Sequence, residues 1–185
     1  MRKVVAYELL SLDGVAEEPD AFITDFDEVM QDNLNDVIAT QDTVLLGRRT
    51  YEEWARHWPA SDIEPFATFI NGVEKFVATS TPLTPAWSNS SEIAGNLATF
   101  ISDLKQRPGG DIGVHASITL VHSLLELGAI DELQLVVAPE LRMHGRRLFE
   151  RGLPTRLSLT GSSVSPSGCL LLAYRAHNSG HLSAT

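Results

Sequence analysis

The residues best suited to binding an anion follow a short apolar segment, residues 43–47. This run ends at Gly47 and is followed directly by Arg48, Arg49 and Thr50. Two guanidinium groups and a hydroxyl at the start of a helix suit a phosphate, because charged donors and free helix amides both favour negative charge there. Gly47 also allows the backbone to approach a ligand closely. The alternative is that both arginines only form ion pairs with the acidic first third of the chain.

Two further segments offer hydroxyls and small residues. Thr79, Ser80 and Thr81 follow an apolar run, although such residues before Pro82 are also common in ordinary turns. Small residues between a predicted strand and a predicted helix let helix amides face an anion. The three segments together predict a site for an extended, multiply phosphorylated ligand, for which a dinucleotide is the natural candidate. The candidate residues of the last segment are Val114, His115, Ala116, Ser117, Ile118 and Thr119.

Several common catalytic motifs are absent from the sequence. It contains no G-x-G-x-x-G fingerprint, no phosphate-binding P-loop, no H-E-x-x-H pair and no G-x-S-x-G elbow. The six histidines are not spaced as metal ligands with Cys or carboxylate partners, so no metal site is expected. Cys169 falls within an apolar run, where we expect inert packing.

Composition excludes further classes of function. The 185 residues carry a formal net charge of −10, which argues against nucleic-acid binding, so the expected partner is the small-molecule ligand of the predicted site. No apolar run approaches the roughly 20 residues of a membrane span. The apolar run near the N-terminus contains Glu8 and lacks a cleavage site, so it is not a signal peptide. A single cysteine fits a cytoplasmic protein.

Strands and helices are predicted to alternate, which places the candidate residues where strands end. Apolar runs predict strands over 4–10, 43–47, 75–80, 87–93, 111–115 and 132–138, and a closing hairpin over 156–164 and 169–176. Helical spacing predicts helices over 25–40, 49–58 (capped by Thr50), 62–70 and 96–107, and one beginning after Ser117 as its cap. This order implies an α/β sandwich with a mostly parallel sheet, whose ligands bind at the carboxyl ends of the strands. We expect one domain over residues 1–177 and a flexible polar tail over 178–185.

The combination of several motifs resembles a known family. They are SLDG at 11–14, the VLL strand with GRRTYEEW behind it, and the run IGVHASITLVHSLLELGAIDELQLVVAPELRMHGRRLFE at 112–150. They look like the dihydrofolate-reductase-like superfamily, and more closely like stand-alone proteins related to the reductase domain of the bacterial bifunctional riboflavin-biosynthesis deaminase-reductase. The resemblance covers about residues 2–176. It implies a three-layer sandwich with a C-terminal antiparallel hairpin, NADPH binding, hydride transfer and a homodimer.

The resemblance also implies roles for the candidate residues. Residues 47–50 would contact the cofactor phosphates, residues 79–81 would lie near the adenosine ribose and its 2′-phosphate, and residues 114–119 would line the pyrophosphate and nicotinamide side. Relatives often carry an Arg in the second motif, so its absence here leaves NADH open as well as NADPH. Ala116 stands where a glycine is usual, which could hinder cofactor approach.

Hydride transfer to a double bond also requires a proton. Dihydrofolate reductases carry an acid on the first helix, but here Gln31 occupies that position, so genuine dihydrofolate reductase activity is not expected. Asp13 and Asp32 are the remaining candidates for proton handling, and their alternatives are an Asp-Gly turn and a solvated helix face. These two stand out from ten acids between Asp13 and Asp42, a stretch without a basic residue.

The sequence therefore predicts an NAD(P)H-dependent reductase of a small heterocycle, resembling 5-amino-6-(5-phosphoribosylamino)uracil reductase of riboflavin biosynthesis. The alternatives are a pteridine or dihydrofolate-type reductase, a ligand-binding protein without turnover, and an enzyme that uses flavin in the same cleft. Trp54 and Trp58 could stack on a heterocycle, although packing is the favoured role. Late arginines at 142, 146, 147, 151 and 156 could receive a substrate phosphate or merely balance an acidic surface.

Overall fold

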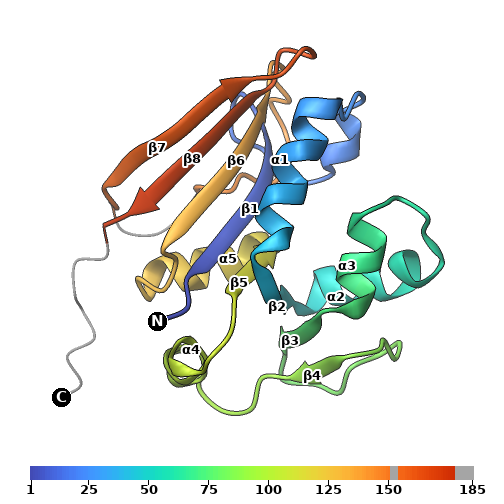
Figure 1. The fold of residues 1–185 in the computed structure, drawn as a ribbon, viewed down its shortest axis with the longest axis vertical. Coiled ribbons are helices and arrows are strands. Elements are labelled where there is room, and N and C mark those ends of the chain that lie inside the picture. Colours follow the sequence, from blue (N-terminus) through green and yellow to red (C-terminus); the bar gives the residue numbers. More distant parts are fainter. Residues whose placement is uncertain (151–153, 178–185) are drawn as a thin grey trace.

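The computed structural model describes residues 1–150 and 154–177, and they form one eight-stranded sheet with helices on both faces (Figure 1). The strands are β1 (Val4–Ser11), β2 (Gln41–Gly47), β3 (Glu74–Ala78), β4 (Ser90–Glu92), β5 (Asp111–His115), β6 (Glu132–Ala138), β7 (Leu157–Val164) and β8 (Leu170–Ala176). The helices are α1 (Glu28–Ala39), α2 (Arg48–His57), α3 (Phe66–Gly72), α4 (Leu97–Gln106) and α5 (Ile118–Glu126), with short 3₁₀ turns η1 (Pro19–Ala21) and η2 (Trp58–Ala60).

The strand order is β4-β3-β2-β5-β1-β6-β8-β7. The first six of these strands pair in parallel, and β8 and β7 add an antiparallel edge. The sequence prediction of a mostly parallel α/β sandwich closed by a hairpin is confirmed. Two predicted elements differ in their bounds. The strand predicted over 75–80 ends two residues earlier, at Ala78, and the helix predicted over 62–70 begins four residues later, at Phe66.

Two apolar layers hold the helices on the sheet. On one face, side chains of α1, α2 and α3 pack against the strands β1, β2, β3, β6 and β8. On the other face, α4 and α5 cover β1, β2, β5 and β6 through residues such as Ile101, Leu104 and Leu124. Strands covered on both faces read as continuous apolar runs rather than as alternating ones, which is why β2 and β5 were recognisable in the sequence.

Two predicted helix caps have different partners in the structure. The N-cap of α2 is Gly47, and Thr50 instead donates its hydroxyl to the carbonyl of Ala116 at 3.0 Å. Ser117 occupies the N-cap position of α5 as predicted, but its hydroxyl accepts from the backbone N–H of Gly47 at 3.0 Å. Both hydroxyls are thus used between elements rather than within one helix.

Two other predictions concern the tail and Cys169. The tail over 178–185 lies outside the described residues. Cys169 is a free, buried thiol packed beside β6 and β8. In the part of the chain that the structure describes, no helix has the length and apolar character needed to cross a membrane.

Candidate functional site

The first and third candidate segments meet at neighbouring strand ends. β2 and β5 pair in parallel, with Leu45 opposite Val114, so Gly47 and His115 end their strands at the same edge of the sheet. From β2 the chain continues through α2 towards β3, and from β5 it continues through α5 towards β6, on the opposite side of the sheet. Such a divergence opens a crevice at the carboxyl ends of the strands, which is the usual ligand site of an open α/β sheet.

Side-chain hydrogen bonds fix the two junctions to each other. The bonds from Gly47 to Ser117 and from Thr50 to Ala116 join the start of α2 to the start of α5. Ala116 adopts a left-handed backbone conformation with φ of 51°. This conformation costs a residue with a Cβ about 1–2 kcal/mol. Surrounding contacts must therefore hold this turn in place.

A cavity of about 1320 Å³ opens at this edge of the sheet. Its wall contains most residues of the first and third segments, but not Val114, which is buried beneath it. The predicted residues in the wall are Gly47, Arg48, Arg49, Thr50, His115, Ala116, Ser117, Ile118 and Thr119. Both α2 and α5 therefore begin in the wall, and their first-turn amides form a setting for an anion.

The second segment does not belong to the wall among the described residues. Ala78, the last residue of β3, lines the cavity, whereas Thr79, Ser80 and Thr81 do not. The hydroxyl of Thr79 donates to the carbonyl of Thr81 and accepts from its backbone N–H at 3.1 Å. The hydroxyls at 79 and 81 thus form the local turn that the sequence left open as their alternative.

The arginines of the first segment form ion pairs, which was the alternative considered for them, and they also line the cavity. Arg48 pairs with Glu52 at 2.7 Å, and Arg49 pairs with Glu53 at 3.0 Å and with Glu17 at 3.4 Å. Both remain at least half exposed and line the cavity, so they can still reach a ligand. Of the late arginines, Arg146 lines the wall, where its guanidinium donates to Thr119 at 2.8 Å, and Arg151 lies outside the described residues.

Neither carboxylate expected to handle protons lies in the wall. Asp13 accepts hydrogen bonds from Ser11 and from the backbone N–H groups of Arg142 and Met143. These bonds, led by the one from Arg142, hold the pKa of Asp13 well below its usual range. Asp32 lies on the exposed side of α1, and Gln31 beside it reaches the wall instead.

The sequence reasoning missed the one buried acid among the described residues of the wall. Glu8, in the middle of β1, is 2% exposed, and its Oε1 atom has no hydrogen-bond partner among the described residues. Burial raises its pKa to about 8, while a backbone hydrogen bond from Ser117 acts in the opposite direction. The available signal was an ionisable residue within an apolar strand, because a charge is rarely buried without a partner. Five further acids, Glu17, Glu18, Asp20, Glu53 and Glu64, also line the cavity, and none of them is fully buried.

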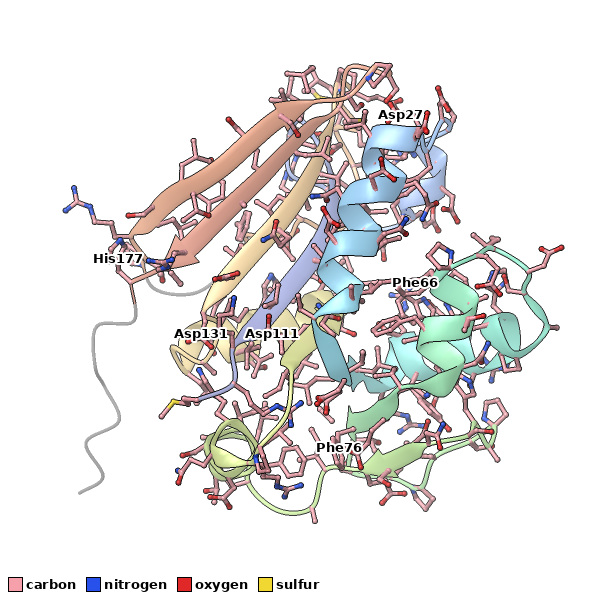
Figure 2. The ribbon with its side chains drawn as sticks, in the orientation of Figure 1. Asp27, Phe66, Phe76, Asp111, Asp131 and His177 are labelled. Atoms are coloured by element: carbon pink, nitrogen blue, oxygen red, sulfur yellow. The ribbon has the colours of Figure 1, made fainter. Side chains whose placement is uncertain are left out.

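Aromatic side chains form another part of the wall. Trp54 and Trp58 meet edge to face at 5.7 Å between ring centroids, and both contact Phe66 at the start of α3 (labelled in Figure 2). The indole nitrogen of Trp58 and the hydroxyl of Tyr7 are buried without a partner in the described structure. Trp54, Trp58 and Phe66 therefore pack against one another, while Trp58 and Tyr7 contribute unpaired polar atoms to the cavity wall.

His115, the last residue of β5, has its ring between those of Tyr7 and Phe66, at 6.0 and 5.6 Å between centroids. Its Nε2 atom lies 2.8 Å from Oε1 of Gln41, and burial lowers its pKa to about 4, so the imidazole is neutral at neutral pH. Among the described residues, His, Cys, Asp and Glu side chains do not gather in groups of three or more that could hold a metal ion.

Comparison with known proteins finds similar chains over nearly the full length. An uncharacterised protein of Bacillus subtilis, YwjB, is 31% identical over 165 residues, which cover 87% of this chain and 91% of YwjB. The crystal structure of a putative riboflavin biosynthesis protein from Shewanella sp. PV-4 superposes with a TM-score of 0.78 at 17% identity, covering 95% of this chain and 99% of the other.

A longer protein contains the same fold as one of its parts. The bifunctional diaminohydroxyphosphoribosylaminopyrimidine deaminase/5-amino-6-(5-phosphoribosylamino)uracil reductase of Thermotoga maritima superposes with a TM-score of 0.67 at 12% identity. The alignment covers 95% of this chain and 57% of that protein. The family model of the RibD C-terminal domain matches residues 2–171, and the chain therefore belongs to the RibD C-terminal domain family.

Proposed function

We propose that this protein is a reductase that transfers hydride from NADPH to a small heterocyclic substrate of the 5-amino-6-(5-phosphoribosylamino)uracil type. The observation that carries the proposal is the convergence of two helix N-termini, those of α2 and α5, on one cavity with an aromatic wall. Membership in the RibD C-terminal domain family supports the same reaction class.

The residues present fit a dinucleotide. Backbone amides at the starts of α2 and α5 are suited to its pyrophosphate, and Arg48, Arg49 and Arg146 add positive charge along the same wall. Residues 79–81 provide no basic group and lie outside the wall, so a 2′-phosphate gains no charged partner from them. We therefore expect NADPH and NADH to bind with similar affinity.

The protein's own groups would bind and orient the substrate. When bound, the nicotinamide supplies the hydride. Trp54 and Trp58 offer ring faces and edges to a planar heterocycle, and the unpaired atoms of Trp58 and Tyr7 can bond its polar edges. A wall of this kind also excludes water from the reacting bond, which strengthens polar interactions within the cavity.

Titration with NADPH and with NADH tests the proposal directly. Nicotinamide fluorescence should change on binding, and both dissociation constants should fall in the micromolar range, about 1–100 μM, with a ratio near one. Absence of binding by both nucleotides at millimolar concentration would refute the reductase assignment. A yellow purified protein would instead indicate a flavin in the cavity.

A further inference from the structure

Glu8 is a buried acid of the cavity wall to which the proposed reductase function gives no role. Its side chain leaves β1 towards the face that α5 covers, as do those of Val4, Ala6 and Leu10 at alternate positions. The backbone N–H of Ser117, the N-cap of α5, stabilises its charged form. The same carboxyl has one buried oxygen without a partner.

No charged neighbour compensates for this buried carboxyl. Besides Glu8, the cavity wall contains titratable or charged groups from several elements, and His122 lies on α5, which packs against the same face of β1. Those of the wall are Tyr7 on β1, His115 on β5, Arg48, Arg49, Glu53 and His57 on α2, Asp20 on η1, and Glu17, Glu18, Glu64 and Arg146 in the loops. Within the described residues, none of these forms a hydrogen bond or an ion pair with Glu8. His115 is bonded to Gln41, and Arg146 is bonded to Thr119. Glu8 therefore has only the N-terminal end of α5 as an electrostatic partner.

We propose that Glu8 determines the charge of the ligand that this cavity accepts, and that a polyanionic nucleotide binds only while Glu8 carries its proton. The inference rests on the proposed function. An ionised Glu8 would occupy the helix N-terminus that otherwise serves a phosphate, and it would repel further negative charge inside a poorly solvated cavity. A protonated Glu8 removes the repulsion and becomes a hydrogen-bond donor.

Proton linkage gives the proposal a quantitative signature. If binding requires the protonated acid, the dissociation constant is constant below the pKa of Glu8 and rises about tenfold for each pH unit above it. With burial placing that pKa at about 8, the rise should begin near that pH. The pyrophosphate of NADH does not titrate in this range, so NADH is the appropriate probe.

The experiment measures NADH affinity by nicotinamide fluorescence from about pH 6.5 to about pH 9.5 at constant ionic strength. Wild type should lose affinity above about pH 8, and Glu8→Gln, which mimics the neutral acid, should bind with a constant affinity. Asp20→Asn is the matched control, because it removes one exposed carboxylate from the same cavity and should retain the wild-type pH profile.

Each outcome decides a different question. Equal and flat profiles for wild type and Glu8→Gln overturn the role of Glu8 and leave the reductase assignment standing. Failure of both proteins to bind NADH and NADPH at millimolar concentration overturns the proposed function, and the role of Glu8 with it.

A second measurement uses only the wild-type protein, so its result does not depend on whether a variant folds. Calorimetry of wild type near pH 9, in two buffers with different ionisation enthalpies, should show uptake of about one proton per NADH bound. A count of zero contradicts the proposal.

Discussion

Replacing Glu8 with glutamine is expected to stabilise the protein increasingly as the pH rises. Burial raises the pKa of Glu8 from its ordinary 4.5 to about 8 in the folded chain. Between these values the folded protein holds a proton that the unfolded chain has released. The stability of wild type is therefore full below about pH 4.5 and falls as the pH rises towards about 8. Glutamine cannot ionise, so the variant does not lose stability in this way.

The size of the effect follows from the pKa difference. Each pH unit across this window costs wild type about 1.4 kcal/mol, which amounts to roughly 5 kcal/mol between pH 4.5 and 8. A difference of even 2 kcal/mol is a large share of the stability of a domain of this size.

Urea unfolding at several pH values between about 5 and 8 measures this difference. Glu8→Gln and wild type should have similar free energies of unfolding at the acidic end, within about 1 kcal/mol, and should diverge steadily above it. Asp20→Asn, on an exposed acid, should follow wild type throughout. A constant difference between wild type and Glu8→Gln across the range would refute the reasoning, since it would mean that Glu8 is ionised in the folded protein at ordinary pH.

Three further substitutions test other parts of the site. Arg49→Ala should weaken NADPH binding roughly fivefold in a fluorescence titration, because it removes charge from the wall, while Arg175→Ala on β8 should not. Asp13→Ala should lower the free energy of unfolding measured in urea, because several donors lose their acceptor; an unchanged stability would reopen a catalytic role for this residue. Ala116→Gly should raise the melting temperature, with a gain of about 1 kcal/mol, because glycine adopts a φ of 51° without strain; a lower melting temperature would contradict this view of the turn.

Local signals in the sequence indicated most of the elements and the two strand-to-helix junctions that line the cavity. Apolar runs marked β2 and β5 because both strands are buried on two faces, and arginines after Gly47 marked the start of α2. The motifs at 11–14, 47–54 and 112–150 also indicated the family that the comparisons confirm. Such signals depend on residues that are near one another along the chain, and they do not require the fold to be known.

Only the tertiary structure decided which of these residues share a site. Pairing of β2 with β5 places Gly47 beside Ser117, although the two residues are 70 positions apart in the sequence. The hydroxyls of 79–81 follow β3, which lies on the other side of β2, and they fall outside the wall. Burial likewise distinguished Glu8 from the exposed acids of the first third. A carboxyl's pKa depends on the solvent and the partners around it in space, and the order of residues along the chain does not specify these.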